Sequence, residues 1–340
     1  MPGCGSRGSA LVPAPSALSS PAHVFAWGAA AGFLGDLLLG DPRRGHPVAA
    51  FGRAAGAVEQ ALWRDDRGRG ALHTLLCVGS AAGAAALAAR AVRHSPVASV
   101  VLTAAATWSV VGGTSLGREA GAIGGALAAG DLDVARERLP HLCGRDPQAL
   151  DGQQMARAVV ESVAENTSDA VVGALVWGAV GGVPGLVAFR AVNTLDAMVG
   201  HKSARHRRFG WASARLDDVA GWPGARLTAA LAVLAGDDPR GALRAWRADA
   251  ASHPSPNAGP VEASFAGALG VRLGGTLAYA GRVENRAVLN GETGRPVEVA
   301  DIERAVRLSL RVNLLALAVC AAGRLALGRA ARGRAKGTKA

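Results

Sequence analysis

Three carboxylates spaced four residues apart are the clearest candidates for chemistry. Glu161, Glu165 and Asp169 fall at helical spacing, which would place them on one helix face over about 12 Å. Like charges at this spacing repel each other unless a cation lies between them, so Mg²⁺ on a phosphorylated substrate or a nearby arginine is needed. We predict that these three residues and Asn166 are catalytic, and that Glu165 and Asp169 also bind metal. The competing interpretation is a solvated helix end that favours a helix dipole.

A second polar group follows the apolar block that starts after Asp169. Asn193 and Asp196 are three residues apart, a spacing that lets both face one cation or one amine. Lys202 follows Gly200, and its amine suits phosphate as a point charge. A polar exit loop would not need an amide, a carboxylate and an amine together. We therefore predict that Asn193, Asp196 and Lys202 bind substrate and its phosphate.

An adjacent acidic pair forms the third group. Neighbouring residues point apart on a helix, so only one of Asp217 and Asp218 is expected to face a given site, while the other pairs with arginine. Both are candidate metal ligands. Arg215, two residues earlier, is a candidate phosphate-binding residue.

The amino-terminal part contains one further carboxylate in an unusual place. Asp36 lies inside an apolar run, where an ionisable residue indicates function by default. Asp41, which precedes a proline, is more simply explained as a cap or turn residue.

Residues 237–262 are dense in turn-forming residues and are predicted to be a stiff polar loop. Three closely spaced prolines near its end fix the backbone and disfavour a helix. Such a loop beside a membrane domain favours a binding element over a spacer. We predict that His253, Ser255 and Asn257 contact substrate.

Several standard sites are absent from the sequence. It has no GxxxxGK[ST] phosphate loop, no GxSxG elbow, no HExxH pair and no GxGxxG turn between a strand and a helix. Its four cysteines lack metal-ligand spacing and suggest no disulfide framework. The net charge of +11 is not accompanied by aromatic residues interleaved with basic ones, so we expect no nucleic-acid partner.

The elements that must position these groups are long apolar blocks. Charged residues gather between the blocks instead of alternating with apolar ones, as they would in soluble amphipathic helices. Each block approaches the length that crosses a bilayer of about 30 Å, so we expect about five spans. The blocks are residues 24–39, 71–89, 96–117, 170–189 and 314–327. Residues 226–235 are too short to cross alone, which leaves a re-entrant piece, a partial span or a buried helix open.

The predicted fold class is all-α, a polytopic integral membrane helical bundle with polar loops and surface helices. A soluble all-α protein rich in alanine and glycine is the alternative. Residues 130–166 are expected to form helices that lie at the membrane surface or cap the bundle. We predict a disordered leader at residues 1–21, a single membrane-embedded catalytic domain at 22–330, and a basic disordered tail at 331–340. Basic flanks beside the apolar blocks fit a multi-pass protein of the cell membrane.

Six motifs, taken in order, resemble those of one family. The chain is similar to the CobD/CbiB family of cobalamin biosynthesis, the adenosylcobinamide-phosphate synthases, over about residues 27–325. The motifs are Gly40-Asp41-Pro42 with His46-Pro47, Gly144-Arg145-Asp146, Glu161-Ser162-Val163-Ala164-Glu165-Asn166, Asn193-Thr194-Leu195-Asp196-Ala197-Met198-Val199-Gly200, Ala214-Arg215-Leu216-Asp217-Asp218, and His253-Pro254-Ser255-Pro256-Asn257-Ala258-Gly259. Two departures are Ser168-Asp169, where the family more often has Asp-Gly, and His201, where an aromatic residue is expected before Lys202.

The resemblance implies an ATP-dependent amide synthesis. It would join a carboxylate of adenosylcobyric acid to the amine of (R)-1-amino-2-propanol O-phosphate and give adenosylcobinamide phosphate. ATP would be a co-substrate and Mg²⁺ a cofactor, and membrane lipid would surround the protein. A homo-oligomer or a complex with other membrane proteins of the cobalamin pathway remains open.

Two other functions remain open from the residues. Membrane transferases that act on phosphorylated alcohols also hold Mg²⁺ with helical carboxylates, and Asp151-Gly152 to Ala156-Arg157 faintly resembles the CDP-alcohol phosphotransferase pattern. A corrinoid transporter or assembly subunit would show charges deep within several spans, and only Asp36 and Arg324 meet that condition.

Overall fold

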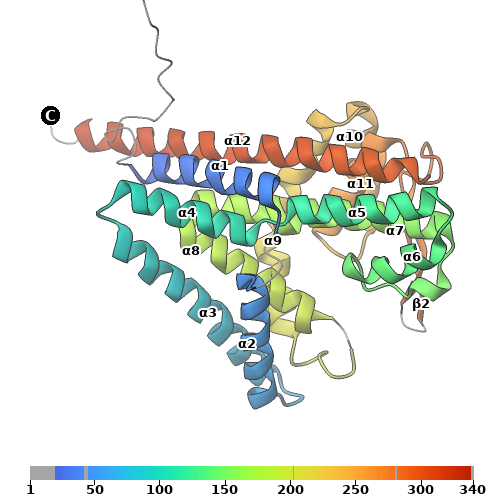
Figure 1. Cartoon of the computed structure of the whole chain (residues 1–340), viewed down its shortest axis with the longest axis horizontal. Helices are drawn as coiled ribbons and strands as arrows, with labels where there is room; N and C mark the ends of the chain where they lie inside the picture. Colours follow the sequence, from blue (N-terminus) through green and yellow to red (C-terminus); the bar gives the residue numbers. More distant parts are fainter. Residues whose placement is uncertain (1–19, 42–44, 202, 280–281, 338–340) are drawn as a thin grey trace, which may run out of the picture.

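The computed structural model describes residues 20–41, 45–201, 203–279 and 282–337. The described chain is helical except for one two-stranded antiparallel sheet, which confirms the all-α expectation. Figure 1 shows α12 running along the molecule beside α1, with α10 and α11 at one end. The longer elements are α1 (Pro21–Leu39), α2 (Pro47–Leu62), α3 (Arg67–Val92), α4 (Pro96–Val110), α5 (Gly113–Ala128), α6 (Leu132–Arg138), α7 (Gly152–Asn166), α8 (Gly173–Leu195), α9 (Trp211–Ala235), α10 (Pro239–Asp249), α11 (Ala258–Leu269), β1 (Leu273–Tyr279), β2 (Arg282–Leu289) and α12 (Ala300–Gly337).

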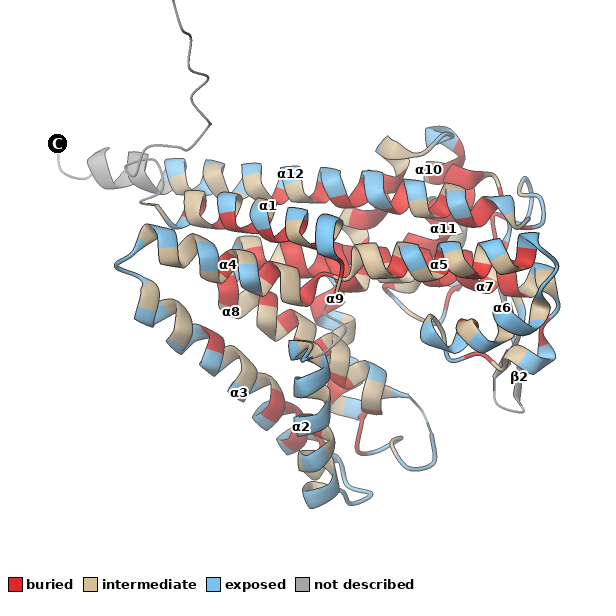
Figure 2. Cartoon of the chain, in the orientation of Figure 1, coloured by how far each residue is buried: buried red, intermediate tan, exposed pale blue. Residues whose placement is uncertain are grey.

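Five helical runs are long and apolar enough to cross a membrane, as the sequence predicts. They are Pro21–Leu39, Arg67–Val92, Pro96–Ala128, Gly152–Gly200 and Ala300–Ala330. In α3 only 6% of the most apolar window is buried inside the protein. Its exposed leucines, such as Leu75 and Leu87, therefore need an apolar medium around them. Figure 2 shows α3 standing apart from the buried centre of the molecule.

The apolar block at 170–189 is a helical hairpin and not a straight span. The backbone of Gly182 has φ 63°, a left-handed conformation that only glycine adopts at little cost. On either side, a Cβ at Gly178 would lie 2.8 Å from the side chain of Leu186, and one at Gly185 would lie 2.1 Å from the Trp177 carbonyl oxygen. Residues this far apart along a straight helix could not touch. The chain therefore reverses at Gly182, and the two arms of α8 pack against each other.

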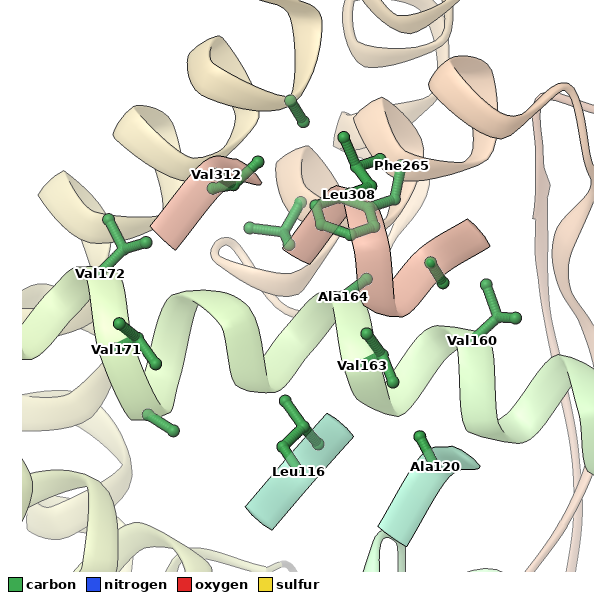
Figure 3. Packing of buried hydrophobic residues seen from close by; sticks show 14 of the residues in the cluster. Leu116, Ala120, Val160, Val163, Ala164, Val171, Val172, Phe265, Leu308 and Val312 are labelled. Atoms are coloured by element: carbon green, nitrogen blue, oxygen red, sulfur yellow. The ribbon is translucent and has the colours of Figure 1, made fainter. Parts of the chain in front are cut away.

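The helix α7 lies in the core, so the expected surface or capping position is wrong for this part of residues 130–166. Its residues from Met155 to Ala164 are buried except for the half-buried Arg157. Figure 3 shows Val163 directed toward Leu116 of α5 and Ala164 directed toward Leu308 of α12. A capping box between Asp151 and Gln154 fixes its first turn. Among the polar residues of α7, Glu161 is buried and faces partners described below, whereas Gln153 is exposed.

The stretch 237–262 is also more ordered than a loop. It contains α10, which starts after its N-cap Asp238 with Pro239 in the first turn, and the beginning of α11. Proline is compatible with a first turn because the N–H it lacks has no helical partner there. Only the residues between α10 and α11 keep the predicted irregular backbone. Residues 226–235 form the carboxyl-terminal part of α9, which packs against α8 and α11.

The predicted domain limits are matched only in part by described residues. Of the leader at 1–21, residues 1–19 lie outside the described residues, and α1 begins at Pro21. The helix α12 reaches Gly337 and so enters the segment predicted as a tail. The division into leader, catalytic domain and tail stays a prediction.

Candidate active site

The hairpin brings the first two sequence motifs to the same end of α8. Glu165 and Asp169 precede its first arm, and Asn193 and Asp196 end its second arm. A straight span would have put the two motifs on opposite sides of a membrane. Both arms carry π-helical turns at these motifs, η4 (Thr167–Val172) and η5 (Asp196–Gly200). Such turns are rare and are often found at functional sites.

Three aspartates gather where the hairpin meets α9. The Asp169 carboxylate interacts electrostatically with Asp217, Asp196 and Arg190, so these groups lie close together. The approach of α9 depends on glycine, because a Cβ at Gly224 would lie 2.8 Å from the Cα of Gly173. We call Asp169, Asn193, Asp196 and Asp217 the aspartate cluster.

Asp217 is the least compensated member of this cluster. Its Oδ1 is buried and has no hydrogen-bond partner among the described residues. Burial and the nearby charge of Asp196 raise the pKa of Asp217 to about 7, although a hydrogen bond from the Asn193 amide acts in the opposite direction. The Asn193 oxygen faces Arg190 at 3.5 Å, so this amide is held between a cation and a carboxylate.

The position of Asp196 depends on the glycine that follows it by four residues. A Cβ at Gly200 would lie 1.8 Å from Asp196 Oδ1. Any larger residue at 200 would therefore displace this carboxylate.

A second polar cluster lies one turn earlier on α7 and is charge-balanced. Glu161 is buried and forms an ion pair with the buried Arg145, while Gly274 N donates to Glu161 Oε1 at 2.7 Å. Arg157 Nε lies 4.0 Å from the same oxygen. A carboxylate with these partners is suited to holding the chain in place.

Glu165 connects the two clusters. It accepts a hydrogen bond from the carboxyl group of Glu262 on α11 and lies near the charges of Arg145 and Arg286. Burial and the neighbouring carboxylates of Glu165 and Glu161 raise the pKa of Glu262 well above its ordinary value, so Glu262 carries the shared proton. We call Arg145, Glu161, Glu165, Glu262 and Arg286 the glutamate–arginine cluster.

His253 lies at the edge of the glutamate–arginine cluster. Its Nε2 is 3.6 Å from Glu262 Oε1, and Ser255 N donates to its Nδ1 at 3.1 Å. Burial lowers the pKa of His253 below its ordinary value, and the nearby charge of Arg286 acts in the same direction.

Two other residues predicted to contact substrate, Ser255 and Asn257, form hydrogen bonds within the protein, and their contact with substrate stays a prediction. The Ser255 hydroxyl accepts hydrogen bonds from the backbone of Asn257 and Ala258 and so supports the start of α11. The Asn257 amide donates to the Asp218 carbonyl oxygen at 3.0 Å and accepts from Arg226 at 3.0 Å. It therefore ties this loop to the part of α9 that carries the acidic pair.

The remaining predicted residues are less central. Asn166 donates to the Ser162 carbonyl oxygen at 2.9 Å, so its amide supports the end of α7. Arg215 is largely exposed and forms an ion pair with Asp218 at 3.2 Å. Asp218 is therefore the member of the acidic pair that pairs with arginine, as the sequence predicts for one of the two. Lys202 lies outside the described residues.

A complete protein cage for a metal is not present. Among the described residues, no three His, Cys, Asp or Glu side chains are arranged to hold a metal ion by themselves. The aspartate cluster does fit a Mg²⁺ ion shared with substrate phosphates, because such ions use one or two carboxylates and an unsatisfied oxygen is available on Asp217.

Sequence reasoning missed Glu262, Arg190 and Arg286. Glu262 was detectable, because it is the single charged residue in the apolar helix α11. Arg190 ends the apolar stretch of α8, and the charges of Asp41 and Asp169 act on it. Arg286 carried no signal, since it lies in a short strand with alternating polar residues.

Comparisons with known proteins agree with this arrangement of motifs. A family model described as CobD/Cbib protein matches residues 29–309. The cobalamin biosynthesis protein CobD of Mycobacterium tuberculosis is 53% identical over 284 residues, covering 82% of this chain and 89% of that protein. The protein of the same name from Chromobacterium violaceum is 43% identical over 298 residues, covering 86% and 95%. No solved structure gives a significant match. With six motifs in order, a matching family model and these relatives, the chain belongs to the CobD/Cbib family.

Proposed function

We propose that this protein acts in cobalamin biosynthesis as a multi-pass enzyme of the cell membrane. It would join adenosylcobyric acid to (R)-1-amino-2-propanol O-phosphate in an ATP-dependent amide synthesis that gives adenosylcobinamide phosphate. The names of the relatives support the pathway. The five long apolar runs support the location, and the arrangement of the polar clusters supports the reaction.

The observation that carries the proposal is the unsatisfied Asp217 oxygen within three clustered aspartates. Carboxylates packed this closely repel each other, so the cluster is stabilised by a cation that arrives with the substrates. Asp196 and Asp217 would hold Mg²⁺. When bound, Mg²⁺ would neutralise the phosphate charge of ATP and orient the reacting phosphate.

Amide formation from a carboxylate needs a leaving group on the acyl carbon. The carboxylate oxygen of adenosylcobyric acid attacks the terminal phosphorus of ATP, which forms an acyl phosphate and releases ADP. The amine nitrogen then bonds to the acyl carbon, phosphate leaves, and the nitrogen loses one proton. Asp169 would accept that proton, because it belongs to the aspartate cluster that would hold the phosphates.

The glutamate–arginine cluster would hold this arrangement in place. Glu165 already accepts a hydrogen bond from Glu262. Glu161 already forms an ion pair with Arg145 and accepts a hydrogen bond from Gly274 N. Both residues belong to the helix that leads directly into η4. Their partners therefore fix the direction in which Asp169 is presented.

The test uses the full-length protein in detergent with adenosylcobyric acid, aminopropanol phosphate, ATP and Mg²⁺, followed by mass spectrometry. The proposal predicts a corrinoid product heavier by the amine minus water, and ADP release in equal amount. Repeated turnover of ATP must require both other substrates, whereas the corrinoid without the amine should release at most about one ADP per enzyme. Absence of this product from protein that retains its fold and binds the corrinoid would contradict the proposal and favour a transport or assembly role.

A further inference from the structure

A cavity lies at the tip of the α8 hairpin, where Gly182 lines it together with residues of α1, α3, α4 and α12. Its volume is about 360 Å³, within the size of small-molecule sites. Most of its wall is apolar, with Val24, Phe25 and Leu102 among the lining side chains. The second arm of α8 runs from this tip to Asn193, over about 16 Å of helix. The cavity is therefore separate from the aspartate cluster.

This cavity lies where three of the apolar runs begin or end. Its lining includes the first residues of Pro21–Leu39 and Pro96–Ala128 and the last residue of Arg67–Val92. Figure 1 shows the turn between α3 and α4 at the same end of the molecule as the carboxyl-terminal part of α12. The ends of membrane-crossing helices lie at the depth of the lipid headgroups. The cavity thus opens where a phospholipid places its phosphate.

Two guanidinium groups line the cavity. Arg324 Nη1 donates to the Val180 carbonyl oxygen at 3.1 Å, which holds this guanidinium against the hairpin tip. Arg93 Nε donates to His94 Nε2 at 2.9 Å. Beyond these two bonds, neither guanidinium has a hydrogen-bond or ion-pair partner among the described residues. Arg93 is exposed and Arg324 is half-buried, so both have donors available for a ligand.

Three helix amino-termini add to this positive charge. The helices α1 and α4 start at the lining residues Pro21 and Pro96, and the second arm of α8 starts after Gly182. The first N–H groups of a helix lack helical partners, and the helix dipole is positive at that end. An anion is favoured at such a place. The α3 helix contributes its carboxyl-terminal end, and its C-cap residue is Arg93.

No carboxylate near the cavity balances these charges. The sequences of α3, α4 and α8 contain no Asp or Glu. The α1 helix contains Asp36, fifteen residues after Pro21, and α12 contains Asp301 and Glu303, more than twenty residues before Arg324. These separations correspond to about four helical turns or more. The helices that form the cavity therefore supply cations to it without an internal counter-ion.

We propose that this cavity binds an anionic phospholipid such as phosphatidylglycerol, with its phosphate at Arg93 and Arg324 and an acyl chain against Val24, Phe25 and Leu102. Guanidinium groups suit phosphate, and basic pockets between membrane helices suit anionic headgroups. The apolar wall favours a lipid over free phosphate. A zwitterionic headgroup fits less well, because its ammonium group would lie beside two uncompensated cations. The inference does not depend on the proposed function.

Lipid binding to the full-length protein tests the proposal. Protein purified in a neutral detergent is titrated with phosphatidylglycerol and, separately, with phosphatidylcholine that has the same acyl chains. Native mass spectrometry measures the bound fraction of each. We expect phosphatidylglycerol to bind about tenfold more tightly or better, since its headgroup carries a net negative charge. Inorganic phosphate, titrated calorimetrically, should not bind at the concentrations at which the lipid saturates the protein.

Variants then locate the binding. Arg93→Ala and Arg324→Ala should each weaken phosphatidylglycerol binding about tenfold or more, because charge-assisted hydrogen bonds to the phosphate are lost. Arg90→Ala and Arg329→Ala are the matched controls, since they remove exposed arginines of the same two helices that do not line the cavity. Both controls should bind like the wild type. Arg93→Ala keeps the proposal testable if Arg324→Ala, which also loses the bond to Val180, does not fold.

Three results would overturn the inference. Equal binding of the two phospholipids would remove the role of the anionic headgroup. Binding of inorganic phosphate as tight as that of phosphatidylglycerol would remove the role of the apolar wall. Equal losses in the cavity variants and their controls, or no loss in any of them, would replace a defined site by a diffuse basic surface. Amide synthesis by the wild type is measured separately and stands or fails independently of all three.

Discussion

The aspartate cluster and the glutamate–arginine cluster include carboxylates from consecutive turns of one helical segment, Asp169 in η4 and Glu161 and Glu165 in α7, yet they differ in how their charges are compensated. Glu161, Glu165 and Glu262 are accompanied by Arg145 and Arg286, and by Arg157 at the edge. Among the described residues, the basic groups that act on the aspartate cluster include Arg190, which acts on Asp169 and also on Asp41, and His201, which acts on Asp196. A group whose charge is balanced within the protein can hold a fold together. A group whose charge is not balanced needs a ligand, which makes it the better candidate for chemistry.

This difference changes the meaning of the sequence motif. The spacing of Glu161, Glu165 and Asp169 suggested three catalytic carboxylates on one helix face, two of them also metal ligands. The structure instead gives Glu161 a complete set of partners and leaves Asp169 with acidic neighbours. Equal spacing along a helix therefore does not imply equal roles.

The largest expected effect is on catalysis at the aspartate cluster. Asp169→Asn should lower the rate of amide synthesis about 10²–10⁴-fold, because a proton acceptor at the reacting nitrogen is lost. Product formation per minute, measured by mass spectrometry, checks this. Asp133→Asn, at an almost fully exposed carboxylate, is the control and should keep wild-type activity. Equal rates for wild type and Asp169→Asn would show that the unbalanced cluster is not the reacting one.

The glutamate–arginine cluster should respond in stability. Arg145→Ala leaves Glu161 buried without its ion-pair partner and should lower the free energy of unfolding by about 3–5 kcal/mol. Unfolding in detergent, followed by tryptophan fluorescence, measures the change. Arg136→Ala removes an ion pair whose Asp133 carboxylate is almost fully exposed and should cost less than about 1 kcal/mol. Similar losses for the two variants would mean that the buried pair does not hold α7.

The distance between the hairpin and α9 should be sensitive to one methyl group. Gly224→Ala places a Cβ against the backbone of Gly173, and such overpacking costs about 1–3 kcal/mol. Because α9 carries Asp217, the rate should fall as well. Gly121→Ala adds a methyl group where nothing lies within 4 Å and should leave both quantities near wild type. A Gly224→Ala protein with unchanged stability and rate would place α9 farther from the hairpin than the structure does.

The pH dependence of stability should come from the aspartate cluster. The folded protein raises the pKa of Asp217 from 3.8 to about 7, so folding favours the protonated form. The contribution of Asp217 to the free energy of unfolding is fully present below pH 3.8 and is lost as the pH rises through about 7. After allowance for partial exposure, we expect a loss of about 1–2 kcal/mol across that window.

Thermal unfolding of wild type and Asp217→Asn between pH 5 and pH 8 tests this expectation. The variant should lose less stability than the wild type as pH rises. Parallel curves for the two proteins would assign the pH dependence to another group.

Much of the fold is readable from the sequence because lipid exposure is a local property. The run Arg67–Val92 is apolar whatever it packs against, so its assignment as a span needs no tertiary information. The hairpin at Gly182 was not predicted, since Gly-Gly-Val-Pro fits a kinked span as well as a reversal. The positive φ at Gly182 and the contact of Gly185 with Trp177 appear only when the two arms meet.

The site shows the same limit. Asp169, Asn193, Asp196 and Asp217 were predicted as site residues in three separate motifs, and the structure brings them together. Which carboxylates are balanced depends on arginines brought in by other elements, such as Arg286 on β2. Sequence spacing contains no information about those distances.

The most direct test is the binding of Mn²⁺, as a spectroscopic substitute for Mg²⁺, to the full-length protein in the presence of ATP. Electron paramagnetic resonance would count bound ions in wild type, Asp217→Asn and Glu262→Gln. The contrast between the clusters predicts that Asp217→Asn loses the ion, whereas Glu262→Gln retains it with near wild-type affinity. Retention by Asp217→Asn, or equal loss in both variants, would contradict the assignment of the external cation to the aspartate cluster.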